Sequence, residues 1–326
     1  MIASQRRGSV LIVVLFVSVV LGLIAVSLAY RSALVLRASR QRAIMAKLQA
    51  QADSVTAIAI MRLSENAANF DHLAQSWHTH GPLAAEDWID DWTADDGDTP
   101  PQFAADYRVS DEEGKLHVLL ASSESLRKLG MSEDQIACLF DYMDGDDYSQ
   151  PGGAESGYYQ ALASPRRCKN APLETLDELL AIKGFGPADY WGPRNGEAGT
   201  TLSWSELLTT CGYGKVNINT VPRAVLRTLG ISEGAVDQID AFRTFDAFSS
   251  GELEDHAFVS SEDIEHLQGL TDADRQMLSG RTVFQSEHFR ILITVRHVPT
   301  GLTHAVDMLV RRLDGRVNIL QRRRAW

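Results

Sequence analysis

The sequence has little cysteine and a shortage of positive charge. Only three cysteines occur in 326 residues, and 31 Lys and Arg stand against 43 Asp and Glu, which gives a net charge of −12. An acidic chain is a poor candidate for binding a nucleic-acid backbone, which requires clustered Lys and Arg. The 44% hydrophobic and 23% charged composition also excludes a wholly disordered chain.

The motifs of common enzymes are absent from the sequence too. It contains no G-x-S-x-G, H-E-x-x-H or Walker motif and no C-x-x-C metal pair. Its nine histidines are scattered, and no nucleophile is paired with a base in any recognisable pattern. We therefore predict that the chain is not an enzyme, and an anchored periplasmic enzyme is the weakest alternative.

The positive charge that the chain does have is gathered at its front. Residues 1–62 hold eight of the Lys and Arg but only one Asp or Glu. Residues 9–30 contain no charge, and at about 1.5 Å per residue this run spans the roughly 30 Å hydrocarbon core of a bilayer. Arg6 and Arg7 precede the run and predict a cytoplasmic N-terminus, with the body across the membrane.

Three kinds of N-terminal segment fit this run. It is long for the apolar part of a secretory signal peptide, and no Ala-x-Ala site closes it. A plain signal anchor is the second possibility. The third, which we favour, is a prepilin-type leader formed by residues 1–8, ending at Gly8, with Ser9 as the N-terminus after cleavage.

The apolar helix is predicted to continue beyond the membrane, over residues 9–62. Residues 31–63 lack Gly and Pro and are rich in good helix formers. An apolar row at i+3 and i+4 spacing predicts that this second half packs against a globular domain. The row consists of Ile44, Leu48, Ala52, Val55 and Ala59.

A helical unit is repeated in the middle of the chain. Residues 115–136 and 215–236 share seven identities at an offset of 100, and looser copies begin at Leu173 and Val259. Each copy is predicted to form a helix, a Gly-centred turn and a second helix, with a Ser or Thr N-cap and a buried apolar residue after the Gly. The expected N-caps are Ser122 or Ser123, Thr175, Thr220, and Ser260 or Ser261; the turn glycines are Gly130, Gly184, Gly230 and Gly269; the apolar residues are Met131, Phe185, Ile231 and Leu270.

These copies resemble the helix-hairpin-helix unit, which commonly binds nucleic-acid backbone. The hairpins here read SEDQ, PADY, SEGA and TDAD, which are acidic or neutral where a phosphate would require Lys or Arg. Protein packing is therefore favoured, and we expect no nucleic-acid partner. A membrane-anchored DNA-binding protein of the uptake or competence type is the alternative.

Predicted strands lie on both sides of this helical block. Residues 107–120 read as a hairpin that turns at Glu113-Gly114, while residues 289–298, 302–313 and 316–322 are strand-like and separated by Pro299-Thr300-Gly301 and Asp314-Gly315. The pattern predicts an α+β fold, in which a helix-on-antiparallel-sheet domain is interrupted by a large all-α insertion of helix-hairpin-helix or SAM-like type. The expected boundaries are 1–8 for the leader, 9–62 for the transmembrane and N-terminal helix, 63–120 for the first part of the sheet domain, 121–280 for the insertion and 281–326 for the C-terminal strands.

Several stretches together resemble the type II secretion (general secretion pathway) protein K family of minor pseudopilins. They are residues 6–16 (RRGSVLIVVLF), 141–159, 169–185, 215–226 and 286–295. Most pseudopilins have Glu as the fifth mature residue, and the K type lacks it. Counted from Ser9, that position is Val13.

The resemblance implies a pilin-like domain with an inserted helical domain, cleavage after Gly8 and N-methylation of Ser9. It implies a subunit that caps the tip of the pseudopilus and helps to initiate its assembly and the export of folded proteins across the outer membrane. The partners would be two other minor pseudopilins, the major pseudopilin, the prepilin peptidase and the inner-membrane assembly platform. The subunit would cross the bacterial inner membrane once, with a cytoplasmic N-terminus and a periplasmic body.

An acidic, glycine-rich loop is the candidate metal site. Hard oxygen ligands on such a loop suit Ca²⁺, although the spacing is not that of an EF-hand, and a solvated acidic loop is the plain alternative. The resemblance implies Ca²⁺ in the inserted domain. The candidate ligands are Asp141, Asp144, Asp146, Asp147 and Glu155.

The three cysteines allow one disulfide if the body is periplasmic. Cys138 lies on an apolar helical stretch and is expected to be a buried thiol. Cys168 and Cys211 lie in loop-like segments and are the expected pair. A second acidic run, residues 86–98, is expected to be a solvated surface loop anchored by its Trp residues.

Overall fold

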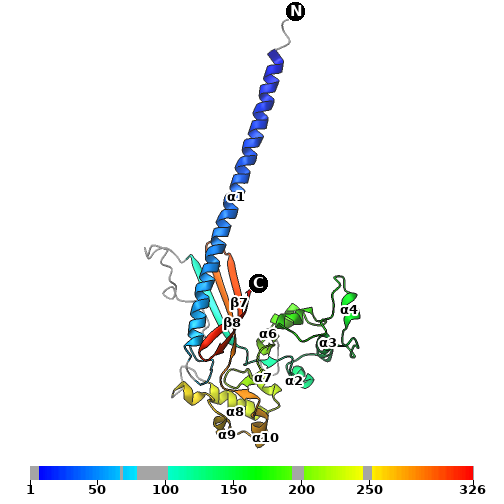
Figure 1. Ribbon diagram of the computed structural model, residues 1–326, viewed down its shortest axis with the longest axis vertical. Coiled ribbons are helices and arrows are strands. Elements are labelled where there is room, and N and C mark those ends of the chain that lie inside the picture. Colours follow the sequence, from blue (N-terminus) through cyan, green and yellow to red (C-terminus); the bar gives the residue numbers. More distant parts are fainter. Residues whose placement is uncertain (1–6, 67–68, 79–101, 193–201, 245–251, 326) are drawn as a thin grey trace, which may run out of the picture.

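The computed structural model describes residues 7–66, 69–78, 102–192, 202–244 and 252–325 (Figure 1). A long helix carries an antiparallel sheet near its C-terminal end, and a helical domain lies on the far side of the sheet from the N-terminus. The helices are α1 (Arg7–Ser64), α2 (Ser123–Lys128), α3 (Glu133–Met143), α4 (Ser156–Gln160), the 3₁₀ helix η2 (Leu176–Ala181), α5 (Pro187–Trp191), α6 (Trp204–Leu207), α7 (Arg223–Thr228), α8 (Glu233–Arg243), the 3₁₀ helix η3 (Leu253–His256), α9 (Ser261–His266) and α10 (Asp272–Leu278). The strands are β1 (Phe103–Asp111), β2 (Leu116–His117), β3 (Leu208–Thr209), β4 (Val216–Asn217), β5 (Thr282–Val283), β6 (His288–His297), β7 (Thr303–Leu313) and β8 (Arg316–Ala325).

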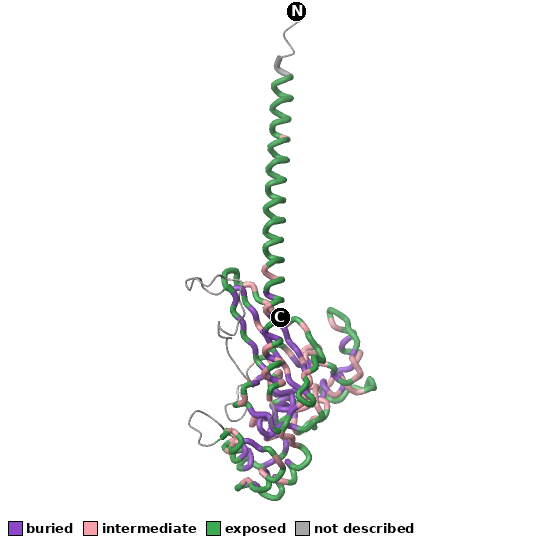
Figure 2. Tube along the Cα trace, turned by 60° about the vertical axis from the view of Figure 1, so that its left-hand side comes forward, coloured by how far each residue is buried: buried purple, intermediate pink, exposed green. Residues whose placement is uncertain are grey.

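Helix α1 has two halves with different surroundings, as predicted. The first half is apolar and exposed around its circumference (Figure 2). Among the described residues, one helix, α1, is both long enough and apolar enough to cross a membrane. The second half buries one stripe against the sheet, and only Ile44 of the predicted row is incompletely buried. The buried stripe consists of Leu48, Ala52, Val55, Ala59 and Leu63.

The sheet has the strand order β1-β6-β7-β8 and is antiparallel throughout. Alternate residues of β6, from Phe289 to Val295, point into the core shared with α1, which is the period-2 pattern of a strand with one buried face. The predicted turn between β7 and β8 is confirmed. Asp314 and Gly315 have φ of 50° and 71°, the two positive values that a type I′ hairpin turn requires.

The predicted hairpin over residues 107–120 is wrong. Strand β1 pairs instead with β6, so that Asp111 lies opposite Phe289, and residues 112–287 form an insertion between two neighbouring strands. After Glu113-Gly114 the chain leaves the sheet, and β2 pairs in parallel with β3. The local turn signal was outweighed by pairing between strands far apart in sequence. The sequence had placed the insertion at 121–280, inside these limits.

The inserted domain contains the four predicted helical hairpins: α2–α3, η2–α5, α7–α8 and α9–α10. Their turn glycines all have φ between 83° and 88°, and the apolar residue after each glycine is buried. The domain is not entirely helical, because it contains two short parallel strand pairs, β2–β3 and β4–β5. Each pair joins the beginning and the end of one helical unit, so the domain consists of two units. We call residues 115–209 the first helical subdomain and residues 215–283 the second.

The internal repeat has a structural basis in both subdomains. Arg127 binds Glu133 in the first, and Arg227 binds Glu233 in the second, so the same ion pair bridges the same turn. One predicted N-cap, Thr220, is wrong. Helix α7 is capped at Pro222, and the Thr220 hydroxyl points into the joint between the domains instead.

Candidate functional site at the domain joint and in the acidic loop

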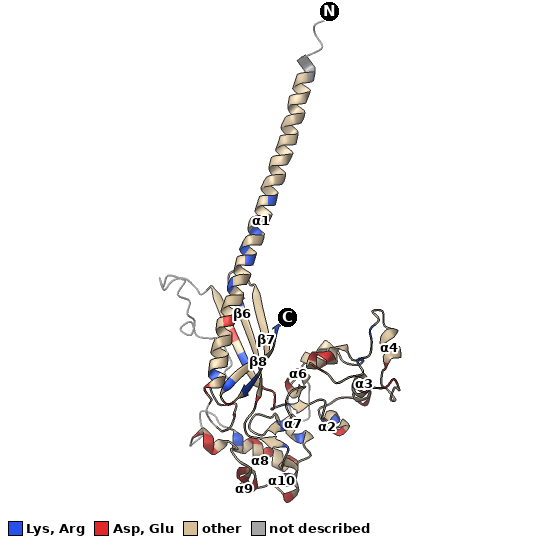
Figure 3. Ribbon diagram, in the orientation of Figure 1, with Lys and Arg blue, Asp and Glu red and all other residues tan. Residues whose placement is uncertain are grey.

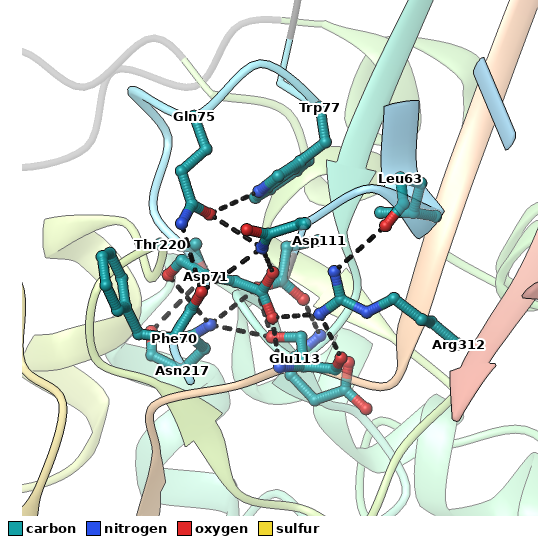
Figure 4. A network of polar contacts seen from close by, with 12 residues as sticks. Leu63, Phe70, Asp71, Gln75, Trp77, Asp111, Glu113, Asn217, Thr220 and Arg312 are labelled. Atoms are coloured by element: carbon teal, nitrogen blue, oxygen red, sulfur yellow. Dashed lines mark hydrogen bonds and ion pairs between the residues drawn. The ribbon is translucent and has the colours of Figure 1, made fainter. Parts of the chain in front are cut away.

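Buried polar groups are concentrated where the inserted domain meets the sheet (Figure 4). We call this cluster the domain joint. Its members come from five segments distant in sequence: the loop after α1, the end of β1, β4 with the loop that follows it, the residue pair before β6, and β7. The core of the joint consists of Asp71, Asp111, Asn217, Thr220, Ser286 and Arg312.

Asp111 is the acceptor at the centre of the joint. Its carboxylate accepts hydrogen bonds from the hydroxyls of Thr220 and Ser286, each at 2.6 Å, from the Asn217 amide at 3.2 Å and from the backbone N–H of Glu113 at 2.9 Å. Burial, reinforced by the nearby charge of Glu113, nevertheless raises the pKa of Asp111 to about 8. The joint therefore holds a carboxyl group that resists ionisation.

A buried ion pair joins the sheet to the loop after α1. The Arg312 guanidinium donates to the carboxylate of Asp71, and these two side chains are 4% and 0% exposed. Arg312 also donates to the carbonyl oxygens of Leu63, at the end of α1, and Ser286. Asp71 accepts a further bond from the Ser286 N–H at 2.7 Å. This pair thus links α1 to both domains.

Residues 217–220, which read N-I-N-T within the stretch 215–226, supply the inserted domain's side of the joint. The Asn217 amide donates to Asp111 and Ser286, while Asn219 bonds both the N–H and the carbonyl of Phe258 in the second subdomain. Both asparagines are buried. The element that carries part of the family resemblance therefore orients the second subdomain on the sheet.

A cleft of about 990 Å³ separates the first subdomain from the sheet. Six of the charged groups that line it form a chain of ion pairs: Lys115 binds Glu112, Arg290 binds Glu112 and Asp307, and Arg323 binds Asp307 and Asp177. Although burial opposes ionisation, Lys115 and Arg290 lower the pKa of Glu112 to about 2. Such mutual pairing favours a structural contact between the two domains over a catalytic centre.

The structure gathers three of the five predicted metal ligands. Asp141, Asp144 and Glu155 each offer an oxygen, and these oxygens lie within 4.8 Å of one another. Asp146 and Asp147 do not join this group. Asp146 accepts the N–H of Tyr148, and Asp147 accepts the Ser156 hydroxyl at 2.6 Å, so both stabilise the loop itself.

The three gathered carboxylates fit a cation. Both Glu155 oxygens and one Asp144 oxygen are buried without a hydrogen-bond partner of normal geometry among the described residues. Burial and the neighbouring carboxylates raise the pKa of both groups, and only the weak Cys168 thiol acts to lower that of Glu155. A buried, unpaired carboxylate is unfavourable unless a cation or proton compensates it.

The sequence interpretation did not identify Asn170 as part of this loop. Its side-chain oxygen is also buried and has no hydrogen-bond partner in the described part of the chain, while its amide donates to the Asp146 carbonyl at 2.9 Å. Asn170 has φ of 46°, the left-handed conformation that Asn tolerates better than most residues. Its only sequence signal was its place in the stretch 169–185.

The predicted disulfide between Cys168 and Cys211 is not formed in this structure, where all three cysteines are free thiols. The Cys168 thiol lies against the Asp141 carbonyl in the acidic loop, whereas Cys211 lies beside Thr210 and near Glu112. Burial raises the pKa of Cys168 to about 11. Assignment to loops alone could not place the two sulfurs. The prediction that Cys138 is a buried thiol is confirmed.

Two other predictions concern the N-terminal half. Gly8 and Ser9 lie in the first turn of α1, and their processing stays a prediction. The acidic run 86–98 lies outside the described residues.

The sequence was compared with models of known protein families. Residues 115–191 match the family described as type II secretion system (T2SS), protein K. The resemblance to this protein family is confirmed. The matched segment runs from the first subdomain's opening strand to α5 and contains the carboxylate cluster. It supports a minor pseudopilin role in type II secretion, for which the long apolar helix fits a single-pass inner-membrane anchor.

A solved structure has a similar fold. It is a chain of the GspK-GspI-GspJ complex from the type 2 secretion system of enterotoxigenic Escherichia coli, with a TM-score of 0.59 and 15% identity. The likeness covers 88% of this chain and 99% of that chain and confirms the α+β fold. The curated proteins contain no match to the sequence.

Proposed function

We propose that the chain is the minor pseudopilin that caps the tip of a type II secretion pseudopilus and helps to initiate its assembly and protein export. The observation that carries the proposal is the position of the insertion. Residues 112–287 project from one end of a helix-on-sheet domain whose membrane helix lies at the other end. A domain of this size would obstruct a further subunit above it, which suits a terminal position.

The proposed partners are inferred from the solved complex to which this fold is similar. Since the structural relative was solved as a GspK-GspI-GspJ complex, we propose two other minor pseudopilins as the direct neighbours. The prepilin peptidase would cleave after Gly8, and Ser9 would become the methylated N-terminus. The apolar half of α1 would then leave the inner membrane, at the assembly platform, for a filament whose shaft is the major pseudopilin. The body would lie in the periplasm.

Replacing residues 112–287 with a short turn should separate capping from folding. Because Asp111 already lies opposite Phe289, a turn can join β1 to β6 as an ordinary hairpin and leave the sheet's core intact. We expect the variant to insert into the membrane but to change the number and length of pseudopili and to abolish secretion of a reporter protein. Filament counts by electron microscopy and a secretion assay would measure this.

The matched control keeps the insertion but replaces Arg127 and Arg227 with glutamine, which removes the ion pair that bridges the same turn in each subdomain. It should assemble normally. If the deletion variant folds, as judged by its circular dichroism, and still starts filaments of normal number and length, the proposed capping by steric obstruction is wrong.

We also propose that the carboxylate cluster of Asp141, Asp144 and Glu155 holds Ca²⁺. Bound Ca²⁺ would supply positive charge to oxygens that lack a partner and would fix the acidic loop onto α3. A ligand present at 100 times its dissociation constant stabilises a fold by about 2.7 kcal/mol. Calcium chelation should therefore lower the melting temperature of the full chain in detergent, and Ca²⁺ but not Mg²⁺ should restore it.

Two single variants test which carboxylates are involved. Glu155→Gln should abolish the calcium-dependent rise in melting temperature, while in chelator it should be at least as stable as the wild type, because it removes charge repulsion. Asp146→Asn changes an acid of the same loop that lies outside the cluster and should keep the calcium response. A calcium response that survives in Glu155→Gln would contradict this ligand set.

A further inference from the structure

A stretch of α1 between the apolar half and the sheet carries five cations and no acid. They are Arg31, Arg37, Arg40, Arg42 and Lys47, and the first acid in the helix is Asp53. All five are exposed (blue on α1 in Figure 3), and none forms a hydrogen bond or ion pair with any residue that the structure describes. We call these five residues the basic collar.

The depth of the collar matches the polar layer of a bilayer. The uncharged run ends at Tyr30, but exposed apolar residues continue from Leu34 to Leu36. At about 1.5 Å per residue, an untilted helix starting at Val10 leaves the roughly 30 Å hydrocarbon core near Tyr30, and a strongly tilted one leaves it near Leu36. The headgroup layer therefore lies over Arg31 in the first case and over Arg37 to Arg42 in the second.

The distribution of the collar around the helix distinguishes between possible partners. At about 100° per residue, Arg31 and Arg42 lie on one side of α1, whereas Arg40 and Lys47 lie on nearly the opposite side. A neighbouring protein would approach from one side and leave half of these charges without a partner. A layer of lipid headgroups surrounds the helix and can reach, on every side of it, the charges that lie at its depth.

We propose that the basic collar binds the phosphate groups of anionic phospholipids and holds the subunit at a defined depth until it is assembled. Lys and Arg near a membrane surface are attracted to anionic lipids, and long side chains can reach the phosphates from either side. In the proposed orientation the collar is on the translocated side, where the charge bias of membrane insertion disfavours Lys and Arg. Lipid phosphates would compensate these charges there.

The test uses the full chain in a neutral detergent, to which phosphatidylglycerol or phosphatidylcholine with identical acyl chains is added. Native mass spectrometry would measure the affinity for each lipid at 50 and 500 mM salt. The wild type should prefer phosphatidylglycerol, and the preference should shrink at high salt. The triple variant Arg37→Gln, Arg40→Gln, Arg42→Gln should bind phosphatidylglycerol at least about tenfold more weakly and phosphatidylcholine equally well.

A matched control removes the same charge from the body. Arg108→Gln, Arg316→Gln and Arg324→Gln change three exposed arginines of the sheet and should leave the lipid preference intact. The proposal is overturned if the wild type binds both lipids equally or if the collar variant keeps its preference. It is also overturned if free glycerol phosphate competes as well as the lipid does, since that would indicate a site for soluble anions.

Discussion

Arg312→Ala is expected to lower the free energy of unfolding by about 3–5 kcal/mol, because it leaves the fully buried carboxylate of Asp71 without its cation. The substitution also removes two donors to backbone carbonyls, those of Leu63 and Ser286, and the stacking of the guanidinium on Phe289. Thermal and urea unfolding of the full chain in detergent would measure the loss. Because Leu63 lies at the end of α1, the connection between the helix and the body should loosen as well.

The neighbouring residue provides the control for this prediction. Arg311 lies on the same strand and binds Glu287, but both partners are about one-third exposed. Exposed ion pairs contribute little, so Arg311→Ala should lower the free energy of unfolding much less than Arg312→Ala does. If the two variants are equally stable, the buried pair does not have the role we assign to it. The double variant of Asp71→Asn and Arg312→Gln should be less destabilised than the sum of the two single changes.

The second large effect is a dependence on pH that originates at Asp111. Its pKa is raised from 3.8 to about 8 in the folded protein, so the folded state binds a proton more tightly than the unfolded state does. The associated stability is complete below pH 3.8 and is lost as the pH rises through 8. The slope reaches at most about 1.4 kcal/mol per pH unit for one group. We expect the contribution of Asp111 to the free energy of unfolding to fall between pH 5 and pH 8.

Asp111→Asn isolates this contribution, because the amide cannot ionise. The variant will lose hydrogen bonds at all pH values, but its stability relative to the wild type should rise steadily from pH 5 to pH 8. Glu112 provides a contrast within the same protein. Its pKa is lowered to about 2, so its contribution is lost only in acid, below this window. A difference between wild type and Asp111→Asn that does not vary with pH would contradict the raised pKa.

The joint explains how a large insertion can be carried without weakening the sheet. The chain leaves the sheet after β1 and returns before β6, and both crossing points are held by buried hydrogen bonds to Asp111 and Asp71. The two domains keep separate hydrophobic cores, one under α1 and one in the helical insertion. Polar contacts therefore determine how the domains are oriented, while apolar packing stabilises each of them.

Features with a local cause could be predicted from the sequence. The uncharged run before Tyr30, and after it the absence of Gly and Pro and an apolar row, predicted a helix over 9–62, close to the observed Arg7–Ser64 of α1. Each helical hairpin follows from a capping residue, a glycine at positive φ and an apolar residue after it, all within a few positions. The Asp314-Gly315 turn and the alternation in β6 are equally local signals. The acidic loop was also singled out as a candidate metal site from its composition, and its binding of Ca²⁺ stays a prediction.

Only the tertiary structure decided which of these pieces meet. The pairing of β1 with β6 joins residues separated by the whole insertion, and no local pattern distinguishes it from a hairpin at Glu113-Gly114. The same holds for Asp71 and Arg312, and for the choice of Asp141, Asp144 and Glu155 over the two neighbouring acids. Sequence patterns report the conformation of a few adjacent residues, whereas these contacts depend on how distant segments exclude water together.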